Sequence, residues 1–236
     1  MTQGLHELLL DRAPDVAPRL LGSVFVCALP GGTVALRLTE LEAYGGPHDS
    51  DLPDPGAHTY RGRTARNASM FEAPGRIYVY FTYGLHHAVN FVCRDEGTGG
   101  GILVRSGEVV LGQDVAARRR LANRSSEPPF VALARGPGNV AQALGLSRED
   151  DGAALVDLGR SDDPAALAEE AVLRTPEPSW TGLALRQEPV GDVVVTPRTG
   201  VSGEGGMDTY PWRFAIAGDP TVSPYRKAAV KRRRTR

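Results

Sequence analysis

Residues 33–44, TVALRLTELEAY, predict a long β-strand that follows the turn Pro-Gly-Gly and an earlier strand, SVFVCAL at 23–29. Side chains of a strand point alternately to its two faces, so the apolar residues at positions 34, 36 and 38 share a face with Glu40, Glu42 and Tyr44. If that face meets the core, the two carboxylates lie at its rim, about 7 Å apart, where partial desolvation suits a general base. The alternative is a strand end that is exposed to solvent.

Further patterns extend outward from this stretch. Strands are predicted at 76–83 and 85–93, which meet in a hairpin at Gly84, and at 101–110, 183–195 and 210–218. Short helices are predicted within 6–22, at 111–122 and at 139–146. Residues 147–180 are acidic and contain prolines, which predicts a peripheral excursion. The pattern indicates one mixed α/β domain over residues 1–225 and a basic, disordered tail over 226–236.

Composition is that of a globular protein with a core, since 41% of the 236 residues are hydrophobic and 23% are charged. No run approaches the roughly 18 apolar residues of a membrane span, and the first residues lack the pattern of a signal peptide. We therefore expect a cytoplasmic protein in which Cys27 and Cys93 are reduced.

The charge is unevenly distributed along the chain. A net charge of −1 argues against a nucleic-acid partner, but residues 227–236 hold six basic and no acidic side chains. Arginines also cluster within 58–76 and 115–124. This segregation permits one basic face that binds nucleic acid. The alternative is ordinary solvated surface charge.

The segment RIYVYFTYG, residues 76–84, carries three tyrosines in the predicted hairpin. Tyr78 and Tyr80 share a face, and tyrosines in such strands usually belong to the core. Tyr83 lies on the other face, beside the glycine of the turn. An aromatic tip next to arginines is what a wedge or stacking platform for nucleic acid requires. His58 begins the basic segment, where a structural hydrogen bond is the alternative to a catalytic role.

No pattern predicts a metal site, because the histidines and aspartates between residues 48 and 58 lack a ligand spacing typical of metal proteins. No cofactor is expected. The sequence RGPGN at 135–139 lacks the lysine of a phosphate-binding loop, but its backbone N–H groups can meet a phosphate at the start of the following helix.

Six blocks appear in the order found in the alkyladenine (3-methyladenine) DNA glycosylase family, which the chain resembles from about residue 15 to residue 224. The blocks are LTELEAYGGPHD, AHTYRGRTARNASMF, PGRIYVYFTYGLHHAVNFV, ILVRSGE, ARGPGNVAQALGL, and PRTGVS followed by YPWRFAI. The resemblance implies a curved, mainly antiparallel sheet flanked by helices, with a protruding hairpin that inserts into DNA.

The resemblance also implies an activity. The enzyme would flip a damaged purine out of duplex DNA and hydrolyse its N-glycosidic bond, leaving an abasic site. Its substrates would be bases such as 3-methyladenine, 7-methylguanine, hypoxanthine and ethenoadenine. Glu42 would activate the attacking water, which makes Glu40 a structural residue. Arg105 and the backbone carbonyl of Thr199 would hold that water. Both lysines lie in the tail, so no lysine Schiff base is expected and the enzyme would be monofunctional.

Carried over in the same way, Tyr44 and Tyr80 would sandwich the flipped base. His58 would complete the pocket, and Asn90 at its floor would disfavour the guanine amino group. Tyr83 would fill the gap left in the base stack. The contacts expected with DNA phosphates come from the basic segment and the glycine-rich turn, at Arg61, Arg63, Arg66 and Gly138.

The expected partner is double-stranded DNA that contains damaged purines, bound by a monomer in the cytoplasm at the nucleoid. The acidic residues 147–177 would lie away from the DNA. Asn139 stands where a lysine is common in the family, which removes one possible phosphate contact. Two other functions remain open, a non-catalytic binder of distorted or damaged DNA and a small-molecule hydrolase with the same glutamate-centred pocket.

Overall fold

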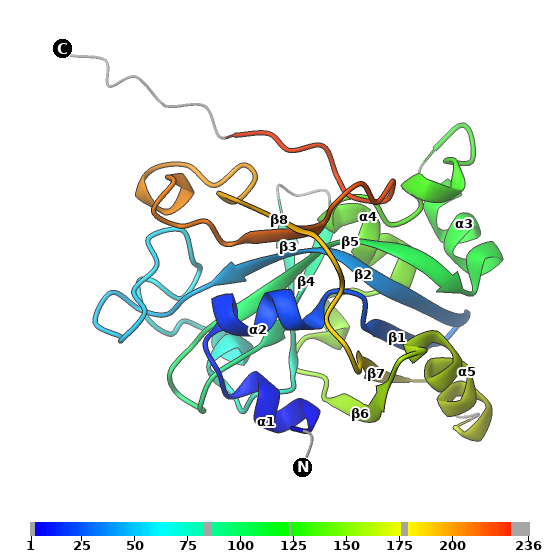
Figure 1. The fold of residues 1–236 in the computed structure, drawn as a ribbon, viewed down its shortest axis with the longest axis horizontal. Helices are drawn as coiled ribbons and strands as arrows, with labels where there is room; N and C mark the ends of the chain where they lie inside the picture. The colour runs from blue at the N-terminus through cyan, green and yellow to red at the C-terminus, as the bar shows by residue number, and fades with distance from the viewer. Residues whose placement is uncertain (1–2, 83–85, 123, 176–178, 228–236) are drawn as a thin grey trace.

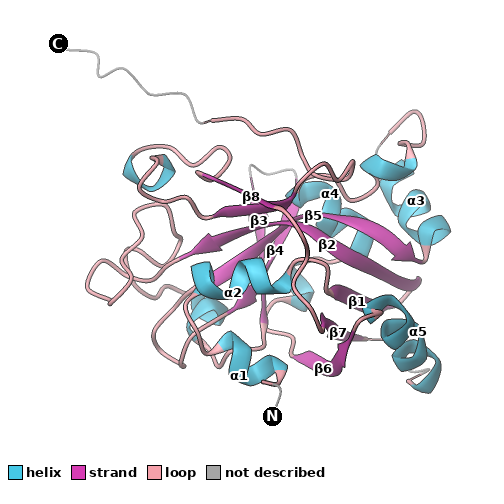
Figure 2. Ribbon diagram, in the orientation of Figure 1, coloured by secondary structure: helices cyan, strands magenta, loops and turns pink. Residues whose placement is uncertain are grey.

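A computed structural model describes residues 3–82, 86–122, 124–175 and 179–227. Within these ranges nine strands form one curled sheet and five α-helices pack around it (Figures 1 and 2). The strands are β1 (Val24–Leu29), β2 (Gly32–Tyr44), β3 (Ile77–Thr82), β4 (His86–Val92), β5 (Gly101–Leu111), β6 (Leu155–Ser161), β7 (Trp180–Arg186), β8 (Val193–Thr196) and β9 (Arg213–Ile216). The helices are α1 (Leu5–Leu9), α2 (Ala13–Leu20), α3 (Gln113–Leu121), α4 (Pro137–Leu144) and α5 (Pro164–Arg174).

The predicted fold class is confirmed, since the domain is mixed α/β with a curled, mainly antiparallel sheet. The strands β3 and β4 pair antiparallel as the predicted hairpin requires. Its tip, with Tyr83 and Gly84, lies outside the described residues, and so do residues 228–236 of the predicted tail.

Strand β2 is the centre of the sheet because its 13 residues are long enough to pair with three other strands. One edge of β2 pairs antiparallel with β5. The other edge pairs with β1 in its first half and with β9 at residues 40–42. The sheet runs in the order β3-β4-β5-β2-β1-β7-β6, and β9 and β8 continue it from the second half of β2.

A β-bulge in β2 turns the second half of the strand over. The pairing with β5 shifts register on both sides of Glu40, and the extra residue of a bulge changes which face the following side chains point to. Leu38 before the bulge and Leu41 after it therefore belong to the same core cluster. The prediction that Glu42 and Tyr44 continue the apolar face of residues 34–38 is wrong, because they project from the opposite face.

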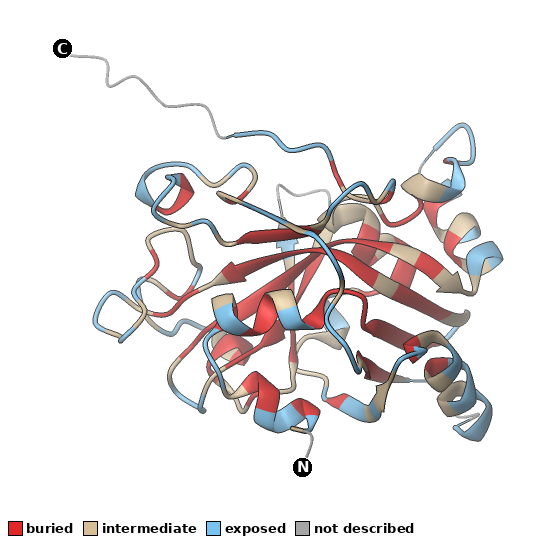
Figure 3. Cartoon of the chain, in the orientation of Figure 1, coloured by how far each residue is buried: buried red, intermediate tan, exposed pale blue. Residues whose placement is uncertain are grey.

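The main core fills the inside of the curled sheet. Phe25 on β1 packs edge-on against Phe91 on β4 with ring centroids 5.0 Å apart, although these strands are not neighbours in the sheet. Apolar residues of α1, α2 and α4 join the same cluster, and Figure 3 shows the buried strands that surround it. A smaller cluster on the outer face packs α5 against β1 and β7.

Residues 147–180 were predicted to form a peripheral excursion. This prediction needs a correction, because the segment also contributes a strand to the sheet. It contains β6, an edge strand parallel to β7, followed by α5. The sequence of β6, LVDLGRS, lacks regular alternation and includes Gly159 at a φ of 90°, so it carries little strand signal. Residues 183–195 return to the sheet as predicted, but as parts of two strands, β7 and β8, with Pro189 between them.

Candidate active site

One row of paired residues crosses four neighbouring strands and includes Glu42, Asn90 and Tyr78. Glu42 of β2 pairs with Leu103 of β5, which in turn pairs with Asn90 of β4. Asn90 pairs with Tyr78 of β3. Because neighbouring strands lie about 4.8 Å apart, the two ends of the row are about 14 Å apart. Glu42 and the tyrosines of β3 therefore face the same region from opposite ends of one row.

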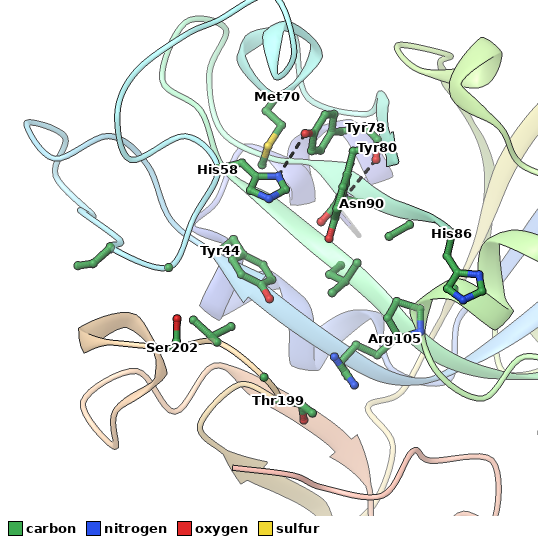
Figure 4. A pocket seen from close by; sticks show the side chains of 18 residues that line it. Tyr44, His58, Met70, Tyr78, Tyr80, His86, Asn90, Arg105, Thr199 and Ser202 are labelled. Carbon is green, nitrogen blue, oxygen red and sulfur yellow. Dashed lines mark hydrogen bonds between the residues drawn. The ribbon is translucent and has the colours of Figure 1, made fainter. Parts of the chain in front are cut away.

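The surface over this row is hollowed into a cavity of about 670 Å³, a size typical of sites for small organic groups (Figure 4). Tyr44 and Thr199 lie on one side of it, and His58 and Tyr80 lie on the other. Seven predicted site residues line this one cavity, namely Tyr44, His58, Tyr80, Asn90, Arg105, Gly138 and Thr199. The structure thus brings together residues that are far apart in the sequence.

Glu42 lies just beneath the cavity wall and is fully buried. Its Oε1 accepts a hydrogen bond of 2.6 Å from the backbone N–H of Thr199. Its Oε2 accepts one of 2.9 Å from the Tyr44 hydroxyl and lies 3.4 Å from Nη1 of Arg105. All three of these partners line the cavity. The three donors converge on the carboxylate as they would on an anion.

Glu40 anchors the arginine that approaches Glu42. The buried Glu40 carboxylate accepts hydrogen bonds from Arg105 and Arg213 at 2.9 and 2.7 Å, and from Ser106 and Ser223. Burial opposes ionisation of Glu40, but the arginines and Ser223 outweigh it and lower its pKa. Burial likewise opposes the charge of Arg105, but Glu42 and Glu40 together raise its pKa. Arg105 is therefore a fixed cation between two carboxylates.

The aromatic wall opposite Glu42 consists of three rings. Tyr80 stacks on Tyr78 with centroids 5.3 Å apart, and His58 meets Tyr80 edge-on at 4.6 Å. Nδ1 of His58 and the Tyr78 hydroxyl share a hydrogen bond of 3.2 Å. Burial, assisted by Arg66, lowers the pKa of His58, whereas burial raises the pKa of Tyr78 to about 12. The wall is therefore uncharged at neutral pH.

Tyr44 forms the other wall, and its hydroxyl remains protonated because burial, followed by the charge of Glu42, raises its pKa. Arg198 lies over its ring, with Cζ 4.4 Å from the ring centroid. The guanidinium of Arg198 also forms a fully buried, two-pronged ion pair with Asp54. This pair was not predicted from the sequence. An aspartate in a loop and an arginine 144 positions later give no local signal of contact.

Asn90 lines the cavity, and its Nδ2 donates a hydrogen bond of 3.2 Å to the carbonyl of Tyr78. Met70 and His86 also line the cavity, and neither was predicted as a site residue. His86 is an exposed residue at the start of β4, packed close to Gly138 at the start of α4. The alternation of side chains along β4 could have predicted its position. His86 and Asn90 are four residues apart, so their side chains lie on the same face of the strand.

Of the predicted phosphate contacts, Gly138 lines the cavity, whereas Arg61, Arg63 and Arg66 do not. Arg61, Arg63 and Arg66 are exposed in the loop before β3, and Arg66 donates a hydrogen bond to the carbonyl of Phe81 near the end of β3. Asn139 donates its side-chain N–H to the carbonyl of Arg135. The basic loop thus lies beside the strand that carries the tyrosine wall.

The described ranges contain neither a metal-binding cluster nor a membrane-spanning helix. Among those residues, no group of three or more histidine, cysteine, aspartate or glutamate side chains is arranged to hold a metal ion. None of the helices found there has the length and apolarity needed to cross a bilayer.

Comparison with known proteins identifies the family of the chain. The family model described as methylpurine-DNA glycosylase matches residues 7–220. The chain belongs to this family. A methylpurine-DNA glycosylase is a hydrolase of DNA repair that binds damaged DNA, and this chain is therefore a DNA glycosylase.

Relatives of the family cover nearly the whole chain. A protein of Streptomyces avermitilis is 46% identical over 94% of this chain and 91% of its own length. Proteins of Leifsonia xyli and Nocardia farcinica are 40% and 42% identical over 96% and 95% of this chain, and over 94% and 92% of their own lengths. Each of the three carries the name "Putative 3-methyladenine DNA glycosylase". The family resemblance inferred from the sequence blocks is confirmed.

Proposed function

We propose that this glycosylase excises alkylated and deaminated purines, of the 3-methyladenine, 7-methylguanine, hypoxanthine and ethenoadenine class, by hydrolysis of the N-glycosidic bond. It acts on duplex DNA at the nucleoid, in the cytoplasm, and leaves an abasic site. A monomer suffices because a lesion has no two-fold symmetry for a dimer to match. The observation that carries the proposal is the buried Glu42 carboxylate, which three donors hold at the end of a cavity walled by aromatic rings.

Base flipping explains the shape of the cavity. A purine inside the duplex cannot reach Glu42, so the nucleotide must rotate out of the stack and enter between Tyr44 and Tyr80. Flipping costs a few kcal/mol and costs least for a damaged or mispaired base, which provides one source of selectivity. Arg61, Arg63 and Arg66 would bind the DNA backbone at the rim, and Tyr83 would fill the gap left in the stack.

The chemistry requires a water molecule next to Glu42. Of the three contacts to its carboxylate, the one from Arg105 is the longest, at 3.4 Å. A water molecule that enters between Arg105 and Glu42 would donate a proton to the carboxylate and direct its oxygen to the sugar carbon. Departure of the base builds positive charge on the sugar, which the Glu42 anion also stabilises. The carbonyl of Thr199 would serve as a second acceptor for this water.

The enzyme is proposed to be monofunctional. The sequence contains two lysines, Lys227 and Lys231, both in the C-terminal segment 226–236. Lys227 is ion-paired with Asp208 at 2.9 Å. Within the described residues, Lys227 does not line the cavity and is therefore not placed to form a Schiff base with the sugar and cut the strand.

The test uses labelled duplexes that contain one hypoxanthine or one ethenoadenine, together with methylated genomic DNA. Each substrate is incubated with enzyme and divided into alkali-treated and untreated halves. We expect strand breaks only in the alkali-treated halves, because hydrolysis leaves an intact strand whose abasic site is cleaved by alkali. Breaks without alkali would contradict the monofunctional assignment. Tight binding without base release from any substrate would favour a non-catalytic damage-binding protein.

A further inference from the structure

The two walls of the cavity differ in what lies behind them. Arg198 is fully buried and does not line the cavity, so it covers the face of the Tyr44 ring that is turned away from the cavity. Behind Tyr80 lies the ring of Tyr78, stacked at an interplanar angle of 20°. One wall is therefore backed by a cation and the other by a neutral ring.

Several contacts fix Arg198 in this position. Its Nη2 donates hydrogen bonds to Asp54 at 2.7 Å and to the carbonyl of Gly205 at 2.6 Å, and its Nη1 donates one to the carbonyl of Ala43 at 3.0 Å. The ring of Trp212 lies 5.2 Å from its Cζ. Burial opposes the charge of Arg198, but Asp54 outweighs it and raises the pKa. The cation behind Tyr44 is thus permanent and immobile.

A cation on one ring face changes what the other face can bind. Aromatic rings attract cations through the negative charge of their faces, and a ring already polarised by Arg198 offers less of this attraction to a second cation. The two cations also repel each other across the ring. A neutral purine keeps its full stacking energy on Tyr44, whereas a cationic purine loses part of it.

We infer that Arg198 is a positioning residue that acts through Tyr44 to set lesion preference, shifting this glycosylase toward neutral purine lesions and away from cationic alkylated purines. The inference rests on the proposed function, because it requires that the damaged base stack on Tyr44. Lesion selectivity then depends on the ion pair of Arg198 and Asp54, which does not contact the substrate.

The measured quantity is the ratio of single-turnover base-release rates for a hypoxanthine duplex and a 7-methylguanine duplex, after subtraction of the loss without enzyme. The variant Arg198→Met with Asp54→Asn removes both buried charges together and leaves neither unpaired. The ratio of neutral to cationic excision should fall by about 3-fold or more, the size of one cation–π contact. Asp54→Asn alone leaves the cation unbalanced and should raise the ratio. A merely structural role would lower both rates and leave the ratio unchanged.

A second pair of variants leaves the buried charges in place and covers the case in which the double variant fails to fold. Tyr44→Leu removes the cation-backed wall and should lower the ratio, whereas Tyr80→Leu removes the neutral wall and should raise it. Shifts of the ratio in the same direction by both variants would overturn the inference. An unchanged ratio in a folded double variant would also overturn it. Failure of the wild-type protein to release either base contradicts the proposed function instead.

Discussion

Thr199 donates its backbone N–H to Oε1 of Glu42 over 2.6 Å, although the two residues are 157 positions apart. This bond ties the loop after β8 to the second half of β2. The neighbouring Arg198 makes the same connection through the carbonyl of Ala43. The candidate general base is therefore fixed by contacts that exist before DNA binds, as electrostatic preorganisation requires.

The Tyr44 hydroxyl is the second contact that orients Glu42, and Tyr44→Phe tests it while the stacking ring is retained. A hydrogen bond to a buried charged group contributes about 1.5–3 kcal/mol, so we expect the single-turnover rate to fall by about 10-fold or more. Affinity for the damaged duplex should stay within about 2-fold, because the wall is intact. Equal losses in rate and affinity would show that the hydroxyl acts in binding instead.

Arg66 should contribute to DNA affinity without discriminating between damaged and undamaged bases. Removal of one phosphate contact by Arg66→Ala should reduce the slope of log affinity against log salt by about 0.9. Binding to damaged and undamaged duplexes should weaken equally. Arg118→Ala is the matched control, since Arg118 is an exposed arginine of α3 that pairs with Asp114 and does not line the cavity. If Arg118→Ala changed the slope by the same amount, the assignment of a phosphate contact to Arg66 would be refuted.

Glu40 should support stability rather than chemistry. Glu40→Gln leaves the buried Arg105 and Arg213 without their shared carboxylate, and breaking a buried pair in this way costs about 3–5 kcal/mol. The folded-state pKa of Glu40 lies below its ordinary value of 4.5. Its stabilisation is therefore fully present above pH 4.5 and is lost as the pH falls through the lowered pKa.

Urea unfolding of the wild type and Glu40→Gln at several pH values checks this expectation. The difference in free energy of unfolding should be constant near neutral pH and should shrink only in acid. A difference that grows as the pH falls would contradict the charge assignment.

Asn90 should discriminate against bases that carry a 2-amino group. Its side chain is fixed on the cavity floor by a hydrogen bond to the carbonyl of Tyr78. Asn90→Ala should raise excision of 7-methylguanine relative to hypoxanthine, which lacks that group. Rates measured for the two duplexes side by side give the ratio. If the excision rates on both substrates fell by the same factor, Asn90 would contribute only to the packing of the cavity floor.

Much of the sheet was predictable because most of its strands carry regular patterns. The stretches around β2, β3, β4 and β5 combine β-branched or aromatic residues with turn residues at their ends, and the structure forms strands at each of them. The bulge at Glu40 was not predictable, since it depends on register with β5. Strand β6 was missed because its pairing with β7 stabilises a sequence with weak strand preference.

The candidate site was found mainly through family resemblance. Residues such as Glu42, Arg105 and Thr199 form one network through contacts between distant segments, which no local pattern reveals. The pair of Asp54 and Arg198 escaped prediction for the same reason. The structure adds a physical cause for the arrangement of the site, because the bulge in β2 is what turns Glu42 away from the core.

Single-turnover base release by Glu42→Gln, measured beside its affinity for the same hypoxanthine duplex, is the decisive test of Glu42 as the general base. The substitution keeps the size of the side chain but removes the anion that accepts the proton of water. The account predicts a rate lower by about 10²- to 10⁴-fold, the usual contribution of a general base, with affinity within about 3-fold of wild type. A variant that releases hypoxanthine at close to the wild-type rate would show that Glu42 is not the base.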